Sequence, residues 1–269
     1  MERNRAARSQ LLRRPSARPN MMVRSTAGDM GDASPVELSL FGGFALRIDG
    51  QRVALPMHAR RVLAYLSLNK MVEKDCDRQV LAERLWVDSP PDRSRASLRT
   101  AIWRIRCAGA DLLLGDAERI AVADSVRVDV HDFRRQAESM LSDDAAADAP
   151  SRIPHLRCAG DLLPGWDEDW LLLTREQLRM LRLHALEQTA RRMCERGFHP
   201  QAIDVILTVV DEEPLRESAQ TILIEAHLHA GNVADACRQY RRFRTDLWNE
   251  LGLRPSAELA RLLDRTANA

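Results

Sequence analysis

The segment "RASLRTAIWRIR", residues 95–106, brings arginines, a threonine and a tryptophan together without any acidic residue. An arginine side chain can bind a DNA phosphate or donate two parallel hydrogen bonds to the O6 and N7 atoms of guanine. A helix that presents such residues on one face suits the major groove of double-stranded DNA. The alternative interpretation is a solvated helix face in an arginine-rich protein.

Helical periodicity, at about 100° per residue, divides this segment into two neighbouring stripes. The apolar stripe, which we expect to face two preceding helices, comprises Leu98, Ala101, Ile102 and Ile105. The basic stripe, about 80° wide at that spacing, comprises Arg95, Arg99, Trp103 and Arg106. Together with their neighbours and one arginine of a later hairpin, the candidate DNA-binding residues are Arg93, Arg95, Arg99, Thr100, Trp103, Arg104, Arg106 and Arg119.

Trp103 has two candidate roles in this arrangement. Its ring can press on a thymine methyl group or a sugar edge in the groove. Alternatively, it can lean against a following hairpin and stiffen the arginines around it. Aromatic residues at helical spacing more often pack than bind, and this favours the second role.

Alternation of apolar and polar residues predicts a β-hairpin at the start of the ordered chain. It runs through "VELSLFGGFALRIDGQRVAL", residues 36–55. Asp49-Gly50 is a strong hairpin turn signal, with residues 52–55 as the return strand. Three helices are then predicted at residues 57–69, at residues 77–88 with Asp77 as N-cap, and from near Asp92 onward.

A second set of short strands is predicted after the third helix. "LLLGDAERIAVADSVRVDV", residues 112–130, reads as two or three strands with turns at Gly115-Asp116 and Asp124-Ser125. The order of hairpin, three helices and hairpin is typical of a winged helix-turn-helix. We therefore expect a mainly α fold with small β-hairpins, beginning with a winged-helix DNA-binding domain at residues 35–130.

The second half of the chain repeats itself. "CERGFHPQAIDVI" and "LHAGNVADACRQY" align Gly197 with Gly231 and Ala202 with Ala236, each pair 34 residues apart. This is the period of tetratricopeptide helix pairs, in which glycine closes the first helix and alanine lets the second pack closely. We expect an all-α tetratricopeptide-like domain at residues 131–269.

Two stretches are predicted to lack a packed structure. Residues 1–34 carry seven arginines without a periodic apolar pattern, which indicates a disordered basic tail or a consequence of start-codon choice. Within the second domain, "SDDAAADAPSRIP" at residues 142–154 is small, acidic and proline-containing, as in a flexible linker. A short helix at residues 131–141 precedes it.

Composition narrows the function further. The formal net charge is +1, so attraction to nucleic acid must come from local surfaces. The five cysteines have no CxxC spacing, which predicts reduced thiols and no zinc site. No apolar stretch approaches the roughly 20 residues that cross a bilayer. With no secretory signal either, we expect a cytoplasmic protein without membrane contact.

Catalytic motifs are not found in the sequence. There is no HExxH, no nucleophile elbow and no glycine-rich phosphate motif. "GWDEDW", residues 165–170, comes nearest to a paired-acid site, but its acids are expected at a helix N-terminus, where negative charge is favourable. We predict a non-enzymatic protein that needs no cofactor or metal.

Several longer motifs point to one family. They are "DGQRVAL", "ERLWVDSPP", "ASLRTAIWRIR" and "VRVDVHDFRR", followed by "GDLLPGWDEDWLLLTREQLRMLRLHALEQ" and "PLRESAQTILIEAHLHAGNVADACRQYRRFRTDLWNELGLRPSAEL". With these motifs the chain resembles the actinobacterial Streptomyces antibiotic regulatory protein family over about residues 36–265. In that family an OmpR-type winged helix precedes a bacterial transcriptional activation domain built on tetratricopeptide-like helices.

The resemblance implies a transcription regulator, usually an activator, that binds repeated promoter sites in double-stranded DNA and recruits RNA polymerase. Because one DNA-binding module buries little surface, we also expect homodimeric or tandem binding on DNA. No receiver domain precedes the winged helix and no ATPase module follows, so a short, single-unit member without phosphorylation-driven dimerisation is expected.

This sequence departs from the family at positions that bear on specificity. Family members often have a polar residue where Arg99 and Trp103 stand, so a base preference cannot be transferred. The hairpin "GDAERIAVADS", residues 115–125, lacks the family's Gly-Gly-Tyr and has Arg119 as its one basic residue, which weakens the case for minor-groove contact. The alternative function is a tetratricopeptide-type adaptor without specific DNA binding.

Overall fold

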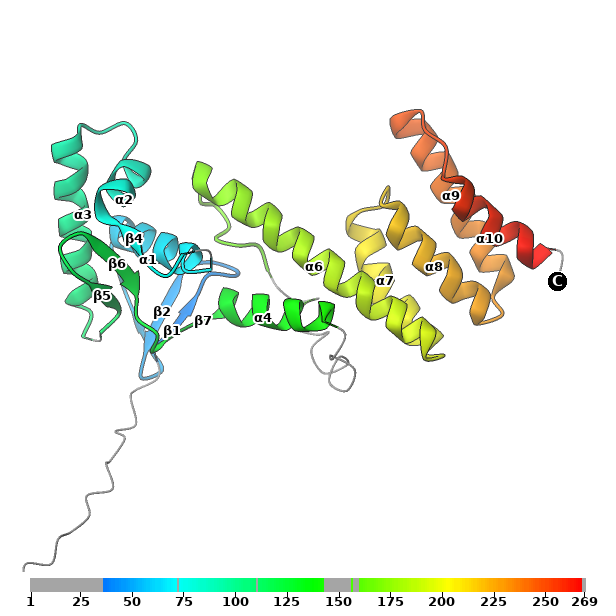
Figure 1. Cartoon of the computed structure of the whole chain (residues 1–269), viewed down its shortest axis with the longest axis horizontal. Coiled ribbons are helices and arrows are strands. Elements are labelled where there is room, and N and C mark those ends of the chain that lie inside the picture. Colours follow the sequence, from blue (N-terminus) through cyan, green and yellow to red (C-terminus); the bar gives the residue numbers. More distant parts are fainter. Residues whose placement is uncertain (1–35, 72, 110, 143–155, 157–159, 268–269) are drawn as a thin grey trace, which may run out of the picture. The chain divides into compact units, whose positions relative to one another are not determined.

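The computed structural model describes residues 36–71, 73–109, 111–142, 156 and 160–267. Most of these residues are helical, and two small sheets lie in the N-terminal half (Figure 1). The predicted tail at residues 1–34 and nearly all of the predicted linker at residues 142–154 fall outside the described residues. None of the described helices is long and apolar enough to cross a membrane.

The first sheet has four strands in the order β3-β2-β1-β7. They are β1 (Val36–Ser39), β2 (Ala45–Ile48), β3 (Gln51–Val53) and β7 (Val126–Val128). The predicted hairpin is confirmed, because β2 and β3 pair antiparallel through Asp49 and Gly50, whose φ angles are 54° and 74°. Positive φ at both positions is what the tight hairpin turn requires. The return strand ends at Val53, two residues earlier than predicted.

The strand β7 corrects the prediction of two simple hairpins. It leaves the second set of strands and pairs in parallel with β1, with Val36 opposite Val126 and Leu38 opposite Val128. All four side chains are buried. The last strand thus returns to the first, since its alternating valines complete the apolar face that β1 begins.

Three helices follow the first hairpin as predicted. They are α1 (Met57–Asn69), α2 (Arg78–Leu85) and α3 (Pro91–Arg106). Asp77 caps α2 as expected, since its carboxylate accepts hydrogen bonds from Gln79 N at 2.7 Å and Val80 N at 3.1 Å. Val80, an apolar residue of this helix, is exposed.

A second sheet has three strands in the order β4-β6-β5. The antiparallel pair β5 (Leu113–Gly115) and β6 (Arg119–Val122) is the predicted second hairpin. The added strand β4 (Cys76–Asp77) was not predicted, because two residues are too few to produce a visible alternation. Gly115 is required in this hairpin, since its φ is 132° and a Cβ atom there would lie 2.2 Å from Arg119 O.

The regular secondary structure of the C-terminal part is helical in its described residues, apart from an isolated β-bridge between Phe41 and Leu162. The helices are α4 (Asp129–Leu141), α6 (Asp169–Glu195), α7 (His199–Glu212), α8 (Glu217–His229), α9 (Val233–Leu251) and α10 (Ala257–Ala267). The predicted 34-residue repeat is confirmed in its details. Gly197 and Gly231, with φ of 81° and 77°, end the first helix of each pair. Ala202 and Ala236 are fully buried on the second helices, α7 and α9 (Figure 1).

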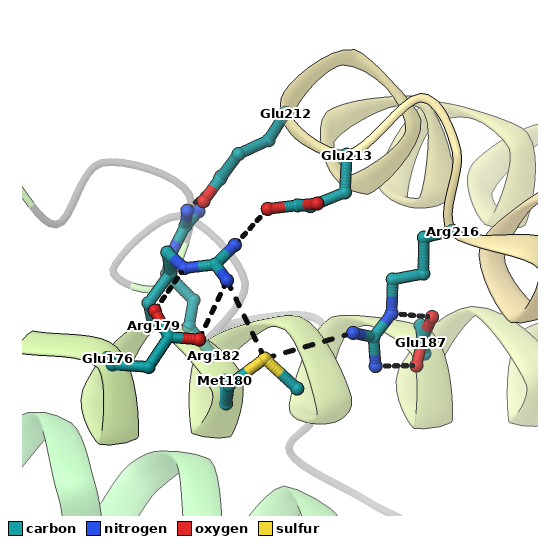
Figure 2. A network of polar contacts seen from close by, with 8 residues as sticks. All are labelled: Glu176, Arg179, Met180, Arg182, Glu187, Glu212, Glu213 and Arg216. Atoms are coloured by element: carbon teal, nitrogen blue, oxygen red, sulfur yellow. Dashed lines mark hydrogen bonds and ion pairs between the residues drawn. The ribbon is translucent and has the colours of Figure 1, made fainter. Parts of the chain in front are cut away.

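A polar network joins α6 to the connection between α7 and α8 (Figure 2). Glu187 is only 8% exposed and accepts hydrogen bonds from Arg216 Nε at 2.7 Å and Ser218 Oγ at 2.7 Å. Burial acts to raise the pKa of Glu187, but the two hydrogen bonds, together with the positive charges of Arg216 and His184, outweigh burial and lower the pKa. Elsewhere in the network Arg179 pairs with Glu213, so α6 is tied to the next helices by charge as well as by apolar packing.

Candidate nucleic-acid interface

Helix α3 is built to bury one face and expose the other. Pro91 occupies its first turn, where the missing N–H costs nothing, and the buried Ser94 hydroxyl donates to Pro91 O at 2.9 Å. The predicted apolar stripe is confirmed, because the buried residues of the helix include Leu98, Ala101, Ile102 and Ile105. This stripe packs against α1 and α2, which fixes the direction of the opposite face.

All seven candidate residues on α3 are exposed. They are Arg93, Arg95, Arg99, Thr100, Trp103, Arg104 and Arg106. The structure therefore brings the residues that were selected from helical spacing onto one solvent-facing side of a single helix. Arg119 lies apart from them on β6.

The arginines of this face differ in how far their charge is already matched. Arg95 Nη1 lies 4.0 Å from Asp92 Oδ1, which is a weak, exposed pair. Within the described part of the chain, Arg93, Arg99, Arg104 and Arg106 have no acidic partner. Unneutralised guanidinium groups on an exposed helix face attract anions such as DNA phosphates.

Trp103 is 56% exposed, so the greater part of it faces solvent, and both of its candidate roles stay predictions. The Cζ atom of Arg104 lies 4.9 Å from the centre of the Trp103 ring, a cation–π contact at the surface. The ring therefore orients Arg104 and remains available to a ligand.

The hairpin β5–β6 offers little positive charge. Arg119 Nε donates to Asp75 Oδ1 at 2.6 Å, so its guanidinium is already paired. The turn of the hairpin carries Asp116 and Glu118. Asp116 accepts the backbone N–H groups of Arg119 and Glu118, both at 2.8 Å, and these bonds lower its pKa and keep it charged. An acidic turn repels phosphate, so Arg119 is a weak DNA-binding candidate.

Several contacts that the sequence did not predict connect α1 with the end of α2 and the start of α6. Arg61 on α1 donates through Nη2 to Leu85 O at the end of α2, at 2.7 Å, and to Glu168 Oε2 at 2.8 Å. Trp170 Nε1 also donates to Glu168 Oε2 at 2.8 Å. Glu168 was expected only to favour a helix N-terminus, but it serves as the acceptor that links α1 to the start of α6. An arginine in an apolar helix and a carboxylate far along the chain gave no local signal of this pairing.

The junction between the first sheet and α4 also depends on a carboxylate. Asp129 accepts backbone hydrogen bonds from Leu40 N at 2.9 Å and Phe41 N at 3.1 Å. Burial raises the pKa of Asp129, although these hydrogen bonds act in the opposite direction. Nearby, His131 Nε2 lies 2.6 Å from Ser67 O, and burial lowers the pKa of this histidine.

No group of three or more His, Cys, Asp or Glu side chains among the described residues is arranged to hold a metal ion. The described cysteines Cys76, Cys107, Cys194 and Cys237 are free thiols. The exposed α3 face is thus the candidate site with the clearest chemistry.

Comparison with known proteins places the helical part in a family. Residues 128–265 match the bacterial transcriptional activator domain. The regulatory protein AfsR of Streptomyces griseus is 28% identical over 208 residues, which cover 70% of this chain and 20% of AfsR. The transcriptional regulator RedD of Streptomyces coelicolor is 39% identical over 80 residues, covering 30% of this chain and 23% of RedD.

A longer match is found with a mycobacterial regulator. The transcriptional regulatory protein EmbR of Mycobacterium tuberculosis is 27% identical over 256 residues, covering 89% of this chain and 65% of EmbR. The structure of M. tuberculosis EmbR in complex with a low-affinity phosphopeptide superposes with a TM-score of 0.70 and 25% identity, over 87% of this chain and 65% of that chain. The present chain therefore spans a fifth of AfsR and less than two thirds of EmbR.

Proposed function

This chain belongs to the bacterial transcriptional activator domain family, and we propose that it is a sequence-specific DNA-binding transcription regulator. In this proposal residues 35–130 act as a winged helix-turn-helix and α3 is the recognition helix. Residues 131–269 hold a second subunit or RNA polymerase, so that the protein acts as an activator at repeated promoter sites. Three relatives with regulator names support the general class.

The observation that carries the proposal is the exposed, arginine-rich face of α3. Arg99 and Arg106 are exposed and have no acidic partners in the described chain. Trp103, which lies between them in the sequence, is exposed to solvent. A rigid helix whose other face is buried can hold these side chains in fixed register against base edges. Each well-formed bidentate contact to a base discriminates by about 1–3 kcal/mol.

The second hairpin has a limited role in the proposed complex. Its one arginine is paired with Asp75, and its turn is acidic. We infer that α3 supplies most of the DNA contacts of one module. A single module of this size buries only about 600–1,000 Å² on DNA. Binding by two modules, through dimeric or tandem contact, compensates for that small area.

The experiment that tests the proposal is a selection of genomic fragments with the purified protein, followed by gel shifts on the enriched fragments. Shifts are compared at about 50 mM and about 200 mM salt, because release of counterions makes DNA affinity fall with salt. If four phosphates are neutralised, affinity falls by about 100-fold over this range. The variant Arg99→Ala/Arg106→Ala should bind enriched fragments much more weakly.

A matched control variant distinguishes a general loss of positive charge from the loss of the α3 site. Arg52→Ala/Arg191→Ala removes two exposed arginines, one from β3 and one from α6, and should leave the shifts unchanged. Enrichment of a few promoter regions with a steep salt dependence supports the regulator. Equal binding of all fragments contradicts sequence specificity, and no binding of any fragment favours the adaptor.

A further inference from the structure

Helix α9 exposes a second group of arginines around a tryptophan. Arg241, Arg244 and Trp248 are spaced three and four residues apart, which places them on one side of the helix. The ring of Trp248 is 55% exposed. The Cζ atom of Arg254, from the segment after the helix, lies 5.9 Å from the centre of this ring. The arrangement repeats the arginine–tryptophan contact seen on α3, but in the helical repeats.

The arginines of α9 fall into two classes. Arg238 pairs with Asp235, and Arg242 Nε lies 3.8 Å from Asp246 Oδ2, so both charges are partly matched. Arg241 and Arg244 have no acidic partner in the described ranges; Arg241 Nε donates only to the backbone oxygen of Cys237, at 3.1 Å. Unmatched positive charge is therefore concentrated on the side of α9 that carries Trp248.

Apolar side chains extend this surface at the end of the helix. Leu251 and Leu253 are each 56% exposed. The apolar cluster beneath α9 contains Phe243 and Leu247 and does not include these leucines or Trp248. We call this surface the α9 basic–apolar face, and it consists of Arg241, Arg244, Trp248, Leu251, Leu253 and Arg254.

Mixed chemistry of this kind identifies the class of partner. Tryptophan and arginine are the residues most enriched among those that dominate protein–protein binding energy. A DNA backbone would use the arginines but would leave the leucines in water, because phosphates and sugars offer them no apolar surface to bury against. A protein segment that carries both carboxylates and apolar side chains complements every member of the face.

We propose that the α9 basic–apolar face binds an acidic amphipathic segment of a partner protein. Its carboxylates pair with Arg241, Arg244 and Arg254, and its leucine or phenylalanine side chains cover Trp248 and the two exposed leucines. The inference rests on the proposed function, because a regulator that recruits the transcription machinery needs a protein-binding surface separate from its DNA-binding helix.

The test uses the full chain and a labelled synthetic peptide in which glutamate pairs alternate with leucine and phenylalanine. Fluorescence anisotropy should detect binding of this peptide, and neither a version with lysine for glutamate nor polyglutamate of equal length should match it. Arg241→Glu/Arg244→Glu should weaken binding at least about tenfold, and Trp248→Ala about 30-fold. The matched control Arg52→Glu/Arg191→Glu reverses two exposed arginines elsewhere and should bind as wild type.

Three results would overturn the inference: no binding of the acidic amphipathic peptide by wild type, equal binding of the lysine version, or unchanged affinity in the α9 variants. All substituted side chains are exposed, so thermal melts should confirm that the variants fold. Gel shifts on enriched promoter fragments separate the two proposals. The α9 variants should shift DNA as wild type does, and a loss of DNA binding in them would identify the face as a DNA surface instead.

The α3 variant Arg99→Ala/Arg106→Ala completes the separation. It should lose promoter binding and retain the peptide. Failure of wild type to bind any promoter fragment, with peptide binding intact, contradicts the proposed DNA-binding function alone. Failure of peptide binding, with promoter binding intact, contradicts the assignment of the α9 face alone.

Discussion

Individual side chains on α3 differ in what they are free to contact. The hydroxyl of Thr100 donates back to Ala96 O at 3.0 Å, and the guanidinium of Arg104 lies over the ring of Trp103. Arg93, Arg99 and Arg106 have neither an acidic partner nor a ring contact within the described residues. These three arginines are therefore the residues most available for base or phosphate contacts.

Replacement of Trp103 by alanine separates a contact role from a packing role. Because the ring is 56% exposed, Trp103→Ala should leave the melting temperature nearly unchanged, as surface substitutions usually alter stability by less than about 0.5 kcal/mol. Promoter affinity should fall several-fold, since both the ring and the position of Arg104 are lost. A large drop in melting temperature, measured by circular dichroism, would favour the packing role.

The buried pair of Glu187 and Arg216 predicts a strong effect on stability. Arg216→Met leaves a carboxylate that is 8% exposed without its main partner, and breaking such a pair costs about 3–5 kcal/mol. Glu187 should then take up a proton at higher pH, because the donor that lowers its pKa has gone. Urea denaturation should show this loss of free energy of unfolding.

A matched double variant tests the cause of that loss. Glu187→Met/Arg216→Met removes both charges and should be more stable than Arg216→Met alone, because no buried charge remains unpaired. If the double variant is as unstable as the single one, packing of the arginine stem and not the unpaired carboxylate explains the effect.

At the scale of elements, local patterns predicted helices and turns well. Asp77 as an N-cap, Asp49-Gly50 as a turn and the two glycines of the repeat each act through neighbouring backbone groups, so their signals lie in short stretches of sequence. Features that join distant segments escaped prediction. The parallel pairing of β7 with β1 and the contact of Arg61 with Glu168 depend on packing that no local period reveals.

The candidate site also has features that the sequence predicts and features that it does not. Membership of the α3 face follows from helical spacing, and all seven predicted residues of that helix are exposed. The exposure of Trp103 and the pairing of Arg119 with Asp75 could not be derived from spacing, because both depend on which neighbours the fold supplies. The function of Trp103 and Arg119 in DNA binding stays a prediction.

The hairpin β5–β6 allows a prediction at this scale. Glu118 is exposed at its turn, and its acidic side chain opposes any approach to phosphate. Glu118→Arg should raise affinity for all DNA fragments and steepen the dependence of log affinity on log salt by about one unit, as one added phosphate contact would. Gel shifts over a salt series measure this slope. An unchanged slope would place the hairpin away from DNA.

For the whole molecule, the connection of α1 to α4 through His131 makes stability depend on pH. Burial lowers the pKa of His131 below its ordinary value of 6.5, and the positive charge of Lys70 acts in the same direction. Because the folded protein favours neutral histidine, the unfolded chain binds the proton first. The free energy of unfolding should therefore fall as the pH drops below 6.5.

The variant His131→Gln tests this dependence. It keeps a side-chain amide that can donate to Ser67 O, which His131 Nε2 approaches at 2.6 Å, but it removes the titrating ring. Urea denaturation between pH 7 and pH 5 should show a smaller loss of free energy of unfolding in the variant than in wild type. Parallel losses in both proteins would assign the pH dependence to other groups.

The central claim for the whole molecule is that α3 selects a DNA sequence while the helical repeats hold protein partners. The most direct measurement is binding-site selection from a randomised duplex library with wild type, Arg99→Ala and the control Arg52→Ala. We predict one motif for wild type and the control, and a loss of preference at one or two base pairs of that motif for Arg99→Ala. Two results would contradict the claim. The first is the absence of a motif for wild type. The second is that Arg99→Ala and Arg106→Ala, measured in the same way, both select a motif identical to that of wild type.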